Sequence, residues 1–532
     1  MLPFVFAASI LSAATNTVWT GGTGDWNTAT NWNNGIPTYQ SGNTATIQNG
    51  STVTTSAPIE GWIVYVNNGS TLTISQAATL TQLRLGNHSL QRTDTLNILD
   101  GADITGQLFH ICGNNANPTP RIVMTGGRIT CTHNGFLPTN QAVVFGYASG
   151  TKGYFQMSGG ELIVNGTSDT SNGLQDVAFG YRVNSYGEGT ITGGSTRIDK
   201  VLYIGYQGDG LFKVSGAGTS VNVGSLSIGT ESTANGEVTI TGGTLTVATS
   251  TLNGSVLSDG SVYVGNAGNG TLNIGGTATI RAEKLILTNS DTATSVLNVT
   301  DGGAIIQVDE LETKNQTNAT ANLHFNVGTR GVSTIETKNF TLETNTTLSV
   351  NTQNGFAFAS DTLKLITATG AGTHAATLES GSVLLSTPTL DGNEISVTLN
   401  PQLRNRVGSS QGWVDISNIP GDISEIILRT NLTEEEEWAA FGNWLLQETG
   451  VESSVESDGL HLLFQEAVMK KNFLWNFSDY AAQDVVLLGL TANGVTLDAN
   501  SLPEPSGWLL MIWGVWGLLR FLPRKHKGAI HG

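Results

Sequence analysis

The sequence predicts an all-β protein: a parallel β-helix, coiled as a right-handed solenoid, followed by a small C-terminal α+β unit and a single C-terminal transmembrane helix. The solenoid is predicted by three copies of one pattern between Val143 and Val223, which read VVFGYASGTKGYFQMSGGELIV, VAFGYRVNSYGEGTITGGSTRI and VLYIGYQGDGLFKVSGAGTSVNV. Alternating apolar and polar residues between fixed glycine turns are typical of short stacked strands. One such repeat cannot bury its apolar face alone, so neighbouring repeats are expected to pack together. Parallel connections of this kind are nearly always right-handed.

Glycines mark two turns in each copy of the pattern. They are Gly146, Gly180 and Gly205 at the first turn, and Gly159, Gly193 and Gly216 at the start of the second turn. Tight corners require a positive φ angle, which glycine adopts without the steric cost that a Cβ brings. We therefore expect positive φ angles at the first-turn glycines.

Composition agrees with an extended β-array and limits its functions. The chain has 66 glycines among 532 residues, and charged residues are 12 % of it, against roughly 25 % in average proteins. Hydrophobic residues, at 39 % and in regular alternation, are enough to bury a core, which argues against disorder. The net charge of −18, without a basic stripe before the tail, argues against nucleic-acid binding, because phosphate contacts need clustered Lys and Arg.

The N-terminal region contains two segments. Residues 1–14 form an apolar run that ends in small residues, and Ser12 and Ala14 suit a signal-peptidase site. We interpret this run as a signal peptide, with an N-terminal strand of the solenoid as the alternative. Residues 15–44 form a segment rich in Trp and Gly, in which Trp19, Trp26 and Trp32 lie among turn residues. These tryptophans are expected to cap the open end of the array; a platform for sugar rings is the alternative.

The β-helix repeats are assigned to residues 45–407. Copies of the pattern recur along this range, and the alternation persists with less regular turns to about Asn400. Cys112 and Cys131 lie on either side of one Gly-Gly turn. In an exported chain they either form a disulfide or remain two buried thiols, and two cysteines alone cannot build a zinc site.

A change of composition at Gly408–Gly412 separates the repeats from a small α+β domain, residues 413–500. Thr433 and Glu436 form a capping box, which predicts a helix that ends before Gly450. Strands are expected at three apolar runs, Glu425–Leu428, Leu460–Phe464 and Val485–Leu490.

Residues 503–532 form a tail of three parts. Pro503, Glu504 and Pro505 precede an apolar segment, residues 507–522, which as a helix would be about 24 Å long. Four cations lie in or after this segment: Arg520, Arg524, Lys525 and Lys527. We interpret the segment as a transmembrane helix whose basic end stays in the cytoplasm while the rest of the chain is exported. A buried C-terminal helix is the alternative.

In this order of motifs, the tail resembles the PEP-CTERM sorting signal of exported bacterial proteins. The resemblance covers about the last thirty residues and implies an exosortase-type membrane protease as a partner, with cleavage near Pro503–Pro505. The segment Trp19–Pro37 and the glycine-paired repeats are also similar to the autotransporter-associated β-strand repeats that accompany such tails. No long run of alternating membrane strands follows, so a self-secreting autotransporter is not expected.

The sequence contains no pattern typical of a cofactor, a metal site or a catalytic centre, and an enzyme is not expected. The eight histidines are scattered, without ligand or triad spacing. Polysaccharide lyases built on β-helices use a basic residue beside acidic metal ligands, and by that resemblance the nearest candidates are Arg197, Asp199 and Lys200. Because these three residues are adjacent at the end of one strand, a solvated edge is the simpler interpretation.

Tyr147, Tyr181 and Tyr206 each follow the first-turn glycine of successive repeats. Equivalent positions in a solenoid stack at about 4.8 Å, so the three rings are expected to form a ladder. The ladder would either stabilise the turns or offer a platform for sugar rings. The leading hypothesis is a structural protein of the cell surface or extracellular matrix, anchored in the membrane before processing. The alternatives are an adhesin that binds exopolysaccharide through the tyrosines and, last, a polysaccharide-degrading enzyme.

Overall fold

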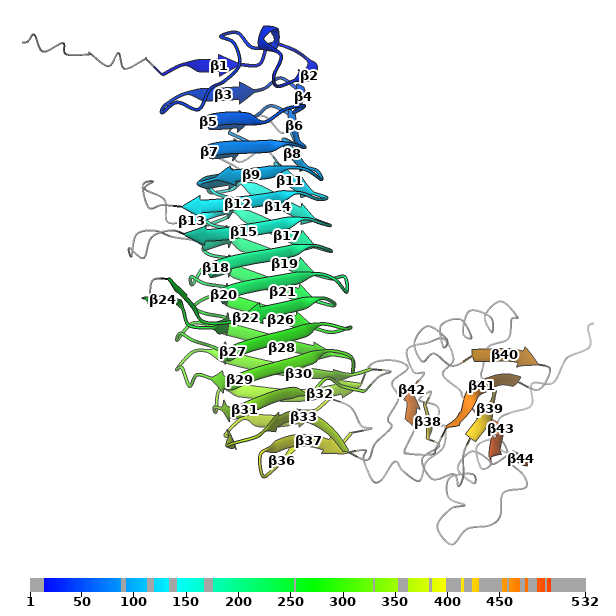
Figure 1. Ribbon diagram of the computed structural model, residues 1–532. Helices are drawn as coiled ribbons and strands as arrows, with labels where there is room; N and C mark the ends of the chain where they lie inside the picture. Colours follow the sequence, from blue (N-terminus) through cyan, green and yellow to red (C-terminus); the bar gives the residue numbers. More distant parts are fainter. Residues whose placement is uncertain are drawn as a thin grey trace, which may run out of the picture. The chain divides into compact units, whose positions relative to one another are not determined.

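Figure 1 shows the computed structural model of the chain. It describes residues 14–87, 92–111, 119–133, 141–166, 176–252, 255–328, 331–352, 362–381 and 385–398, together with seven strands between 413 and 498. The chain divides into two compact units. The first comprises Met1–Leu297, Ile306–Ala321 and Thr337–Thr346, and the second comprises Asn298–Ile305, Asn322–Glu336 and Thr347–Gly532.

The first unit is a solenoid of stacked coils (Figure 1), and its strand pairings define three columns of parallel strands. Strands of the first column pair in register from one coil to the next. They are β2 (Thr23–Asp25), β4 (Thr52–Thr54), β6 (Thr71–Ile74), β8 (Thr95–Ile98), β11 (Arg121–Met124), β14 (Lys152–Met157), β17 (Tyr186–Ile191), β19 (Asp209–Val214), β21 (Asn235–Ile240) and β26 (Asn269–Ile274).

The second and third columns follow in each coil. The second contains β9 (Asp103–Gly106), β12 (Arg128–His133), β15 (Glu161–Gly166) and β22 (Thr244–Val247). The third contains β1 (Asn16–Val18), β3 (Thr44–Ile47), β10 (Leu108–Ile111), β13 (Gln141–Phe145), β16 (Asp176–Phe179) and β25 (Ser261–Val264). Long strands run through both: β5 (Ile59–Val66), β7 (Ala77–Leu85), β18 (Ser195–Ile204), β20 (Ser220–Ile228) and β27 (Thr279–Leu287).

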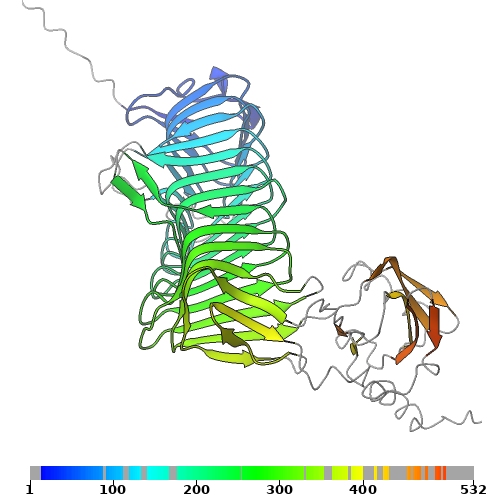
Figure 2. The ribbon, with the colours of Figure 1, turned by 60° about the horizontal axis from the view of Figure 1, so that its bottom comes forward.

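Among the described residues of the first unit, two features interrupt the regular coils. A short 3-10 helix, Ala29–Asn31, lies in the first coil. Strands β23 (Ser250–Leu252) and β24 (Ser255–Ser258) form an antiparallel hairpin that projects from the side of the solenoid (Figures 1 and 2).

The core lies inside the coils, where alternate residues of each strand are buried. In β14 the side chains of Phe155 and Met157 point inward, while Lys152 and Gln156 are exposed. Equivalent inward residues of successive coils stack on one another, as the alternation of the sequence predicts. For example, the rings of Phe145 and Phe179 are parallel within 5°, with centroids 4.6 Å apart.

Positive φ angles occur at the glycine corners, as predicted. They are 75° at Gly146, 69° at Gly180 and 70° at Gly205. At the second turn the positive φ falls on the second glycine of each pair, with 86° at Gly160 and 81° at Gly194.

Parallel pairing begins before residue 45, the predicted start of the β-helix repeats. Strand β1 pairs with β3 from Asn16, within the segment predicted to be only a cap. The three tryptophans of this segment are 0–4 % exposed and pack edge to face, with centroids 4.8 and 5.0 Å apart. Their burial favours the cap over a sugar platform, because buried rings offer no face to a ligand.

Parallel pairing also ends before the predicted boundary at about Asn400. In the second unit, β33 (Thr362–Ala368) and β36 (Thr389–Asp391) both pair with β37 (Glu394–Thr398) in antiparallel fashion. Strands β36 and β37 are joined by a tight hairpin, because Asp391 pairs with Glu394 and leaves Gly392-Asn393 as the two-residue turn, in which Gly392 has a φ of 58°. The remaining strands here are β34 (Gly372–His374) and β35 (Thr377–Ser380). Strands β28 (Thr294–Thr300), β29 (Ile305–Thr313), β30 (Thr320–Val327), β31 (Ile335–Leu342) and β32 (Thr346–Thr352) contain residues of both units.

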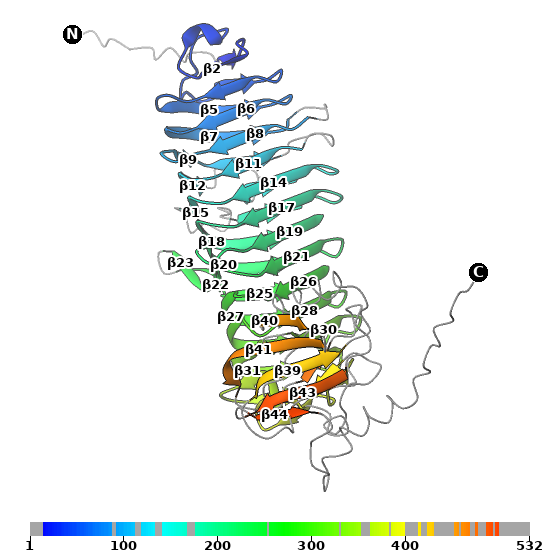
Figure 3. The same ribbon diagram turned by 90° about the vertical axis from the view of Figure 1, so that its right-hand side faces the viewer.

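The C-terminal part of the second unit contains an antiparallel sheet in the order β40-β41-β39-β43-β44 (Figure 3). Its strands are β39 (Ile423–Arg429), β40 (Glu452–Glu456), β41 (Gly459–Val468), β43 (Val486–Ala492) and β44 (Val495–Asp498), while β38 (Trp413–Asp415) pairs with β42 (Leu474–Asn476). Strands β39, β41 and β43 confirm the three predicted from apolar runs.

Several predicted segments lie outside the described residues. They are the signal peptide apart from Ala14, the helix expected from Thr433, and the whole tail with its sorting motif, transmembrane segment 507–522 and basic cluster. Among the residues that are described, no helix is both long and apolar enough to cross a membrane.

Candidate binding surface on the solenoid

The three predicted tyrosines do form a ladder on the corner between the third and first columns. Ring centroids of Tyr147 and Tyr181 are 5.8 Å apart and those of Tyr181 and Tyr206 are 5.2 Å apart, with interplanar angles of 7° and 18°. His110 extends the ladder at one end, with its ring 4.4 Å from that of Tyr147. At the other end the ring of Tyr203 meets Tyr206 edge to face at 5.0 Å.

The register of the third column explains how these rings fit together. His110 and Tyr203 occupy the same position of this column, two coils lying between them. The intervening coils have the smaller Val144 and Ala178 at that position. Short side chains there leave room beside the sheet for the rings of Tyr147 and Tyr181.

Because the tyrosine rings stack on one another, the ladder leaves few ring faces exposed to a ligand. Each ring face inside the ladder is covered by its neighbour, and the guanidinium of Arg182 lies 5.0 Å from the ring centre of Tyr181. A sugar ring binds a tyrosine through the open face of the aromatic ring, so the interior of the ladder offers only ring edges and hydroxyls. This geometry favours the turn-stabilising interpretation of the ladder.

A groove lies beyond the Tyr203 end of the ladder, under hairpin β23–β24. We call it the hairpin groove. It has a volume of about 350 Å³ and is lined by Val201, Tyr203, Ser225, Ser227, Val256, Leu257, Ser258, Asp259, Tyr263 and Asn266. Ser225 and Ser227 point out of the sheet yet are only 4 % and 2 % exposed, because the groove walls cover them.

Asp259 is the charged group of the hairpin groove. Its carboxylate accepts hydrogen bonds from the hydroxyls of Tyr263, at 2.6 Å, and Ser225, at 2.7 Å, and from the backbone N–H of Ser261 at 3.2 Å. Partial burial acts to raise the pKa of Asp259, but these hydrogen bonds outweigh it and hold the pKa below its ordinary value. The carboxylate is therefore ionised and held in a fixed orientation at neutral pH.

The hairpin that covers the groove is attached to the solenoid by its own side chains. The backbone N–H and the hydroxyl of Thr249 donate to the Glu283 carboxylate at 2.7 and 2.8 Å. Ser250 donates to the carbonyl oxygen of Asp199 and lies 2.8 Å from the hydroxyl of Ser258. These contacts hold the hairpin against the wall of the solenoid.

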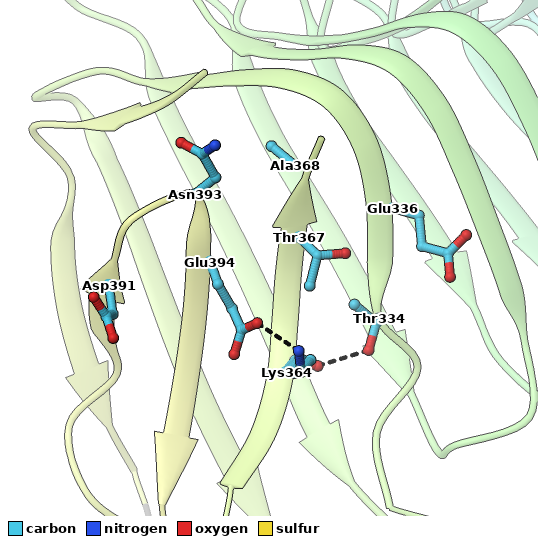
Figure 4. Close-up of a pocket in the computed structure, with 8 residues that line it drawn as sticks. All are labelled: Thr334, Glu336, Lys364, Thr367, Ala368, Asp391, Asn393 and Glu394. Carbon is cyan, nitrogen blue, oxygen red and sulfur yellow. Dashed lines mark hydrogen bonds and ion pairs between the residues drawn. The ribbon is translucent and has the colours of Figure 1, made fainter. Parts of the chain in front are cut away.

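A second groove lies in the second unit (Figure 4). It has a volume of about 590 Å³ and is lined by Thr334, Glu336, Lys364, Thr367, Ala368, Asp391, Asn393 and Glu394. Lys364 forms an ion pair with Glu394 at 2.7 Å, and the hydroxyl of Thr334 donates to the carbonyl oxygen of Lys364 at 2.8 Å. The cation and one of the carboxylates thus neutralise each other, and no aromatic side chain lines this groove.

Two of the three residues suggested by the resemblance to polysaccharide lyases, Arg197 and Asp199, form an ion pair at the surface. Arg197 and Asp199 are 2.7 Å apart, and the side chain of Arg197 is 64 % exposed. Lys200 lies near Asp176, a buried carboxyl whose pKa is raised to about 7 by burial, against opposing effects of Lys200 and the Val201 N–H. Within the described part of the chain, no three His, Cys, Asp or Glu side chains gather as a metal site would require.

Of the two cysteines, only Cys131 lies among the described residues. The thiol of Cys131 is buried, lies 3.3 Å from the carbonyl oxygen of Gln107, and has a pKa raised by burial. Cys112 lies outside the described residues, so the disulfide stays a prediction.

Sequence reasoning found the tyrosine ladder but missed the hairpin groove. The signal in the sequence is the segment between Val247 and Ser261, which interrupts the repeat pattern. Compared with protein families, curated proteins and solved structures, the chain shows no match.

Proposed function

We propose that this chain is an exported structural protein of the cell surface or extracellular matrix, a right-handed β-helix sorted by its C-terminal tail. The observation that carries the proposal is the continuous parallel pairing of the first column, from β2 to β26. The ten described strands of this column in the first unit, at about 4.8 Å each, make a stack of roughly 45 Å. Such a stack is stiff because each coil is hydrogen-bonded along its strands to its neighbours.

The outer surface of the solenoid suits a structural role outside the cell. Asn235 donates to Asp209 and Asn269 donates to Asn235, each at 2.8 Å, so side chains of successive coils form hydrogen-bonded rows. Ion pairs such as Arg128–Glu161, at 2.8 Å, are exposed and contribute little to stability. Small polar rows keep the surface hydrated without a strong charge pattern.

In this proposal, the C-terminal tail directs the protein to the cell surface. The segment 507–522 spans the membrane, and Arg520, Arg524, Lys525 and Lys527 keep its end in the cytoplasm. An exosortase-type protease then cuts near Pro503–Pro505 and passes the solenoid to the surface or matrix. The support for this step is the tail sequence and its resemblance to PEP-CTERM signals.

The test removes the tail in the native host. Deletion of Pro503–Gly532 should release the protein into the medium, because no segment remains to stop export in the membrane. Changing Arg524, Lys525 and Lys527 to Glu should impair orientation, whereas the matched control, Arg524→Lys with Lys525→Arg and Lys527→Arg, should behave as the parent. Cell fractionation and the mass of the mature termini provide the measurement. A deletion variant that stays as firmly bound to cells as the parent would contradict the proposal and favour adhesion by the solenoid.

A further inference from the structure

The hairpin groove is built by an insertion at one corner of a coil. In the two preceding coils this corner is short: β18 passes it between Ile198 and Val201, and β20 passes it between Val223 and Ser225. In the next coil the chain instead leaves β22 at Val247 and rejoins the third column only at Ser261. Insertions into a repeat array commonly map to the face that binds a ligand.

The groove lies where the series of aromatic rings is interrupted. In register, Tyr203, Ser227 and Tyr263 occupy one position in three successive coils. The two tyrosines are therefore two strand spacings apart, about 9.6 Å between their Cα atoms. Between them stands only a serine, so the two side chains border a slot.

Earlier coils fill the corresponding slots with their own rings. Over Val144 and Ala178, the rings of Tyr147 and Tyr181 stack between His110 and Tyr206. In the coil of Ser227, the residue after the corner glycine is Thr230 instead of tyrosine, and its hydroxyl lies 2.9 Å from that of Ser227. Within the part of the chain that the structure describes, no ring occupies this slot.

Polar groups of fixed orientation surround the slot. Tyr263 donates its proton to Asp259, so the oxygen of Tyr263 keeps its lone pairs for a hydroxyl of a ligand. Asn266 is held on two sides, since it donates to Ser227 at 3.3 Å and accepts from Asn289 at 2.8 Å. Val256 and Leu257 of the hairpin add apolar side chains to the lining of the groove.

We propose that the hairpin groove binds an uncharged saccharide of one or two sugar units, with a sugar ring in the slot between Tyr203 and Tyr263. A sugar ring has the required combination of apolar C–H faces for the tyrosines and hydroxyls for Asp259, Tyr263 and Asn266. The volume of about 350 Å³ suits a ligand of this size. The carboxylate of Asp259 disfavours acidic sugars. This site is independent of the tail and of the proposed sorting.

Calorimetric titration of the full-length protein tests the proposal. The probes are maltose, cellobiose, xylobiose, mannobiose and diacetylchitobiose, with digalacturonate as the charged control and benzamide as the aromatic control. We expect at least one neutral disaccharide to bind with a Kd of about 1 mM or tighter, and digalacturonate to bind at least about tenfold more weakly. Binding of benzamide without any sugar, equal binding of digalacturonate, or no binding of any neutral sugar would each overturn the proposal.

A pair of matched variants locates the site. Val256 is 67 % exposed on the hairpin, so Val256→Asp should leave the fold intact, while placing a second carboxylate at the groove and weakening sugar binding at least about tenfold. The control is Val183→Asp, at a residue 43 % exposed on the corner between β16 and β17, and it should bind as the parent does. Circular dichroism and the melting temperature verify folding of both. Equal affinity of the two variants would place the sugar elsewhere and refute the assignment.

Discussion

At Gly146 both the backbone angle and the space beside it require glycine. The φ angle is 75°, and an added Cβ would lie 2.6 Å from the carbonyl oxygen of Tyr186 in the next coil. Gly146→Val should therefore lower the free energy of unfolding by about 1–3 kcal/mol or more, measured by urea denaturation. Gly218→Val is the matched control, because an added Cβ there meets nothing within 4 Å. Equal losses for both variants would show that corner geometry does not matter.

Asp176 makes stability depend on pH. Burial raises its pKa to about 7 from the ordinary 3.8, so the folded state holds a proton that the unfolded state releases. The stability from this protonated carboxyl is complete below about pH 4 and is lost as pH rises to about 7. Asp176→Asn removes this dependence and still accepts the hydrogen bond from the Val201 N–H.

We expect the Asp176→Asn variant to gain stability over the parent as pH rises from 4 to 7, by at most about 1.4 kcal/mol per pH unit. Above that range the difference should become constant, since the carboxyl is then ionised in both states. Urea denaturation at a series of pH values measures the difference. A gap that does not change with pH would mean that Asp176 titrates normally in the folded protein.

At the scale of elements, the tyrosine ladder joins corners that are far apart in sequence. The stacked rings of Tyr147 and Tyr181 should have a coupling energy of about 0.5–1.5 kcal/mol in a double-mutant cycle of alanine substitutions. Tyr147 and Tyr263 serve as the control pair, because they lie four coils apart and Tyr147 stacks on His110 and Tyr181 while Tyr263 bonds to Asp259. Their effects on the free energy of unfolding should be additive within about 0.5 kcal/mol. Equal coupling in both pairs would indicate a general destabilisation instead of ring stacking.

Strands and corners were predictable because their causes are local. Alternation shows in each strand which side chains turn inward, and glycines mark positions where φ is positive. The ends of the solenoid were less predictable, because β1 differs from the repeat pattern and β37 pairs in antiparallel fashion with β33 and β36. Pairing direction depends on a partner strand elsewhere in the chain, and alternation is the same for parallel and antiparallel neighbours.

At the scale of the whole first unit, each coil contacts mainly its neighbours, so a complete coil should be removable. Deleting Asp209–Ala234 brings Asn235 to the position of Asp209, its partner in register, and the next coil can pair with β17. We expect a folded protein with a parallel-β circular dichroism spectrum and a lower melting temperature. Deleting only Asp209–Val221 leaves half a coil and should abolish cooperative unfolding. Folding of the half-coil deletion would contradict a register-locked solenoid.

The sequence by itself determined the strand pattern, the glycine corners, the placement of the three tyrosines and the existence of a chemically distinct tail. Only the tertiary structure brought His110 to the tyrosine ladder, and Tyr203, Asp259 and Tyr263 to one groove. The physical reason is that coils differ in length. Register partners in the first column are 34 residues apart between β14 and β17, 23 between β17 and β19, and 26 between β19 and β21. Without a constant repeat length, sequence spacing does not reveal which outward side chains of different coils become neighbours.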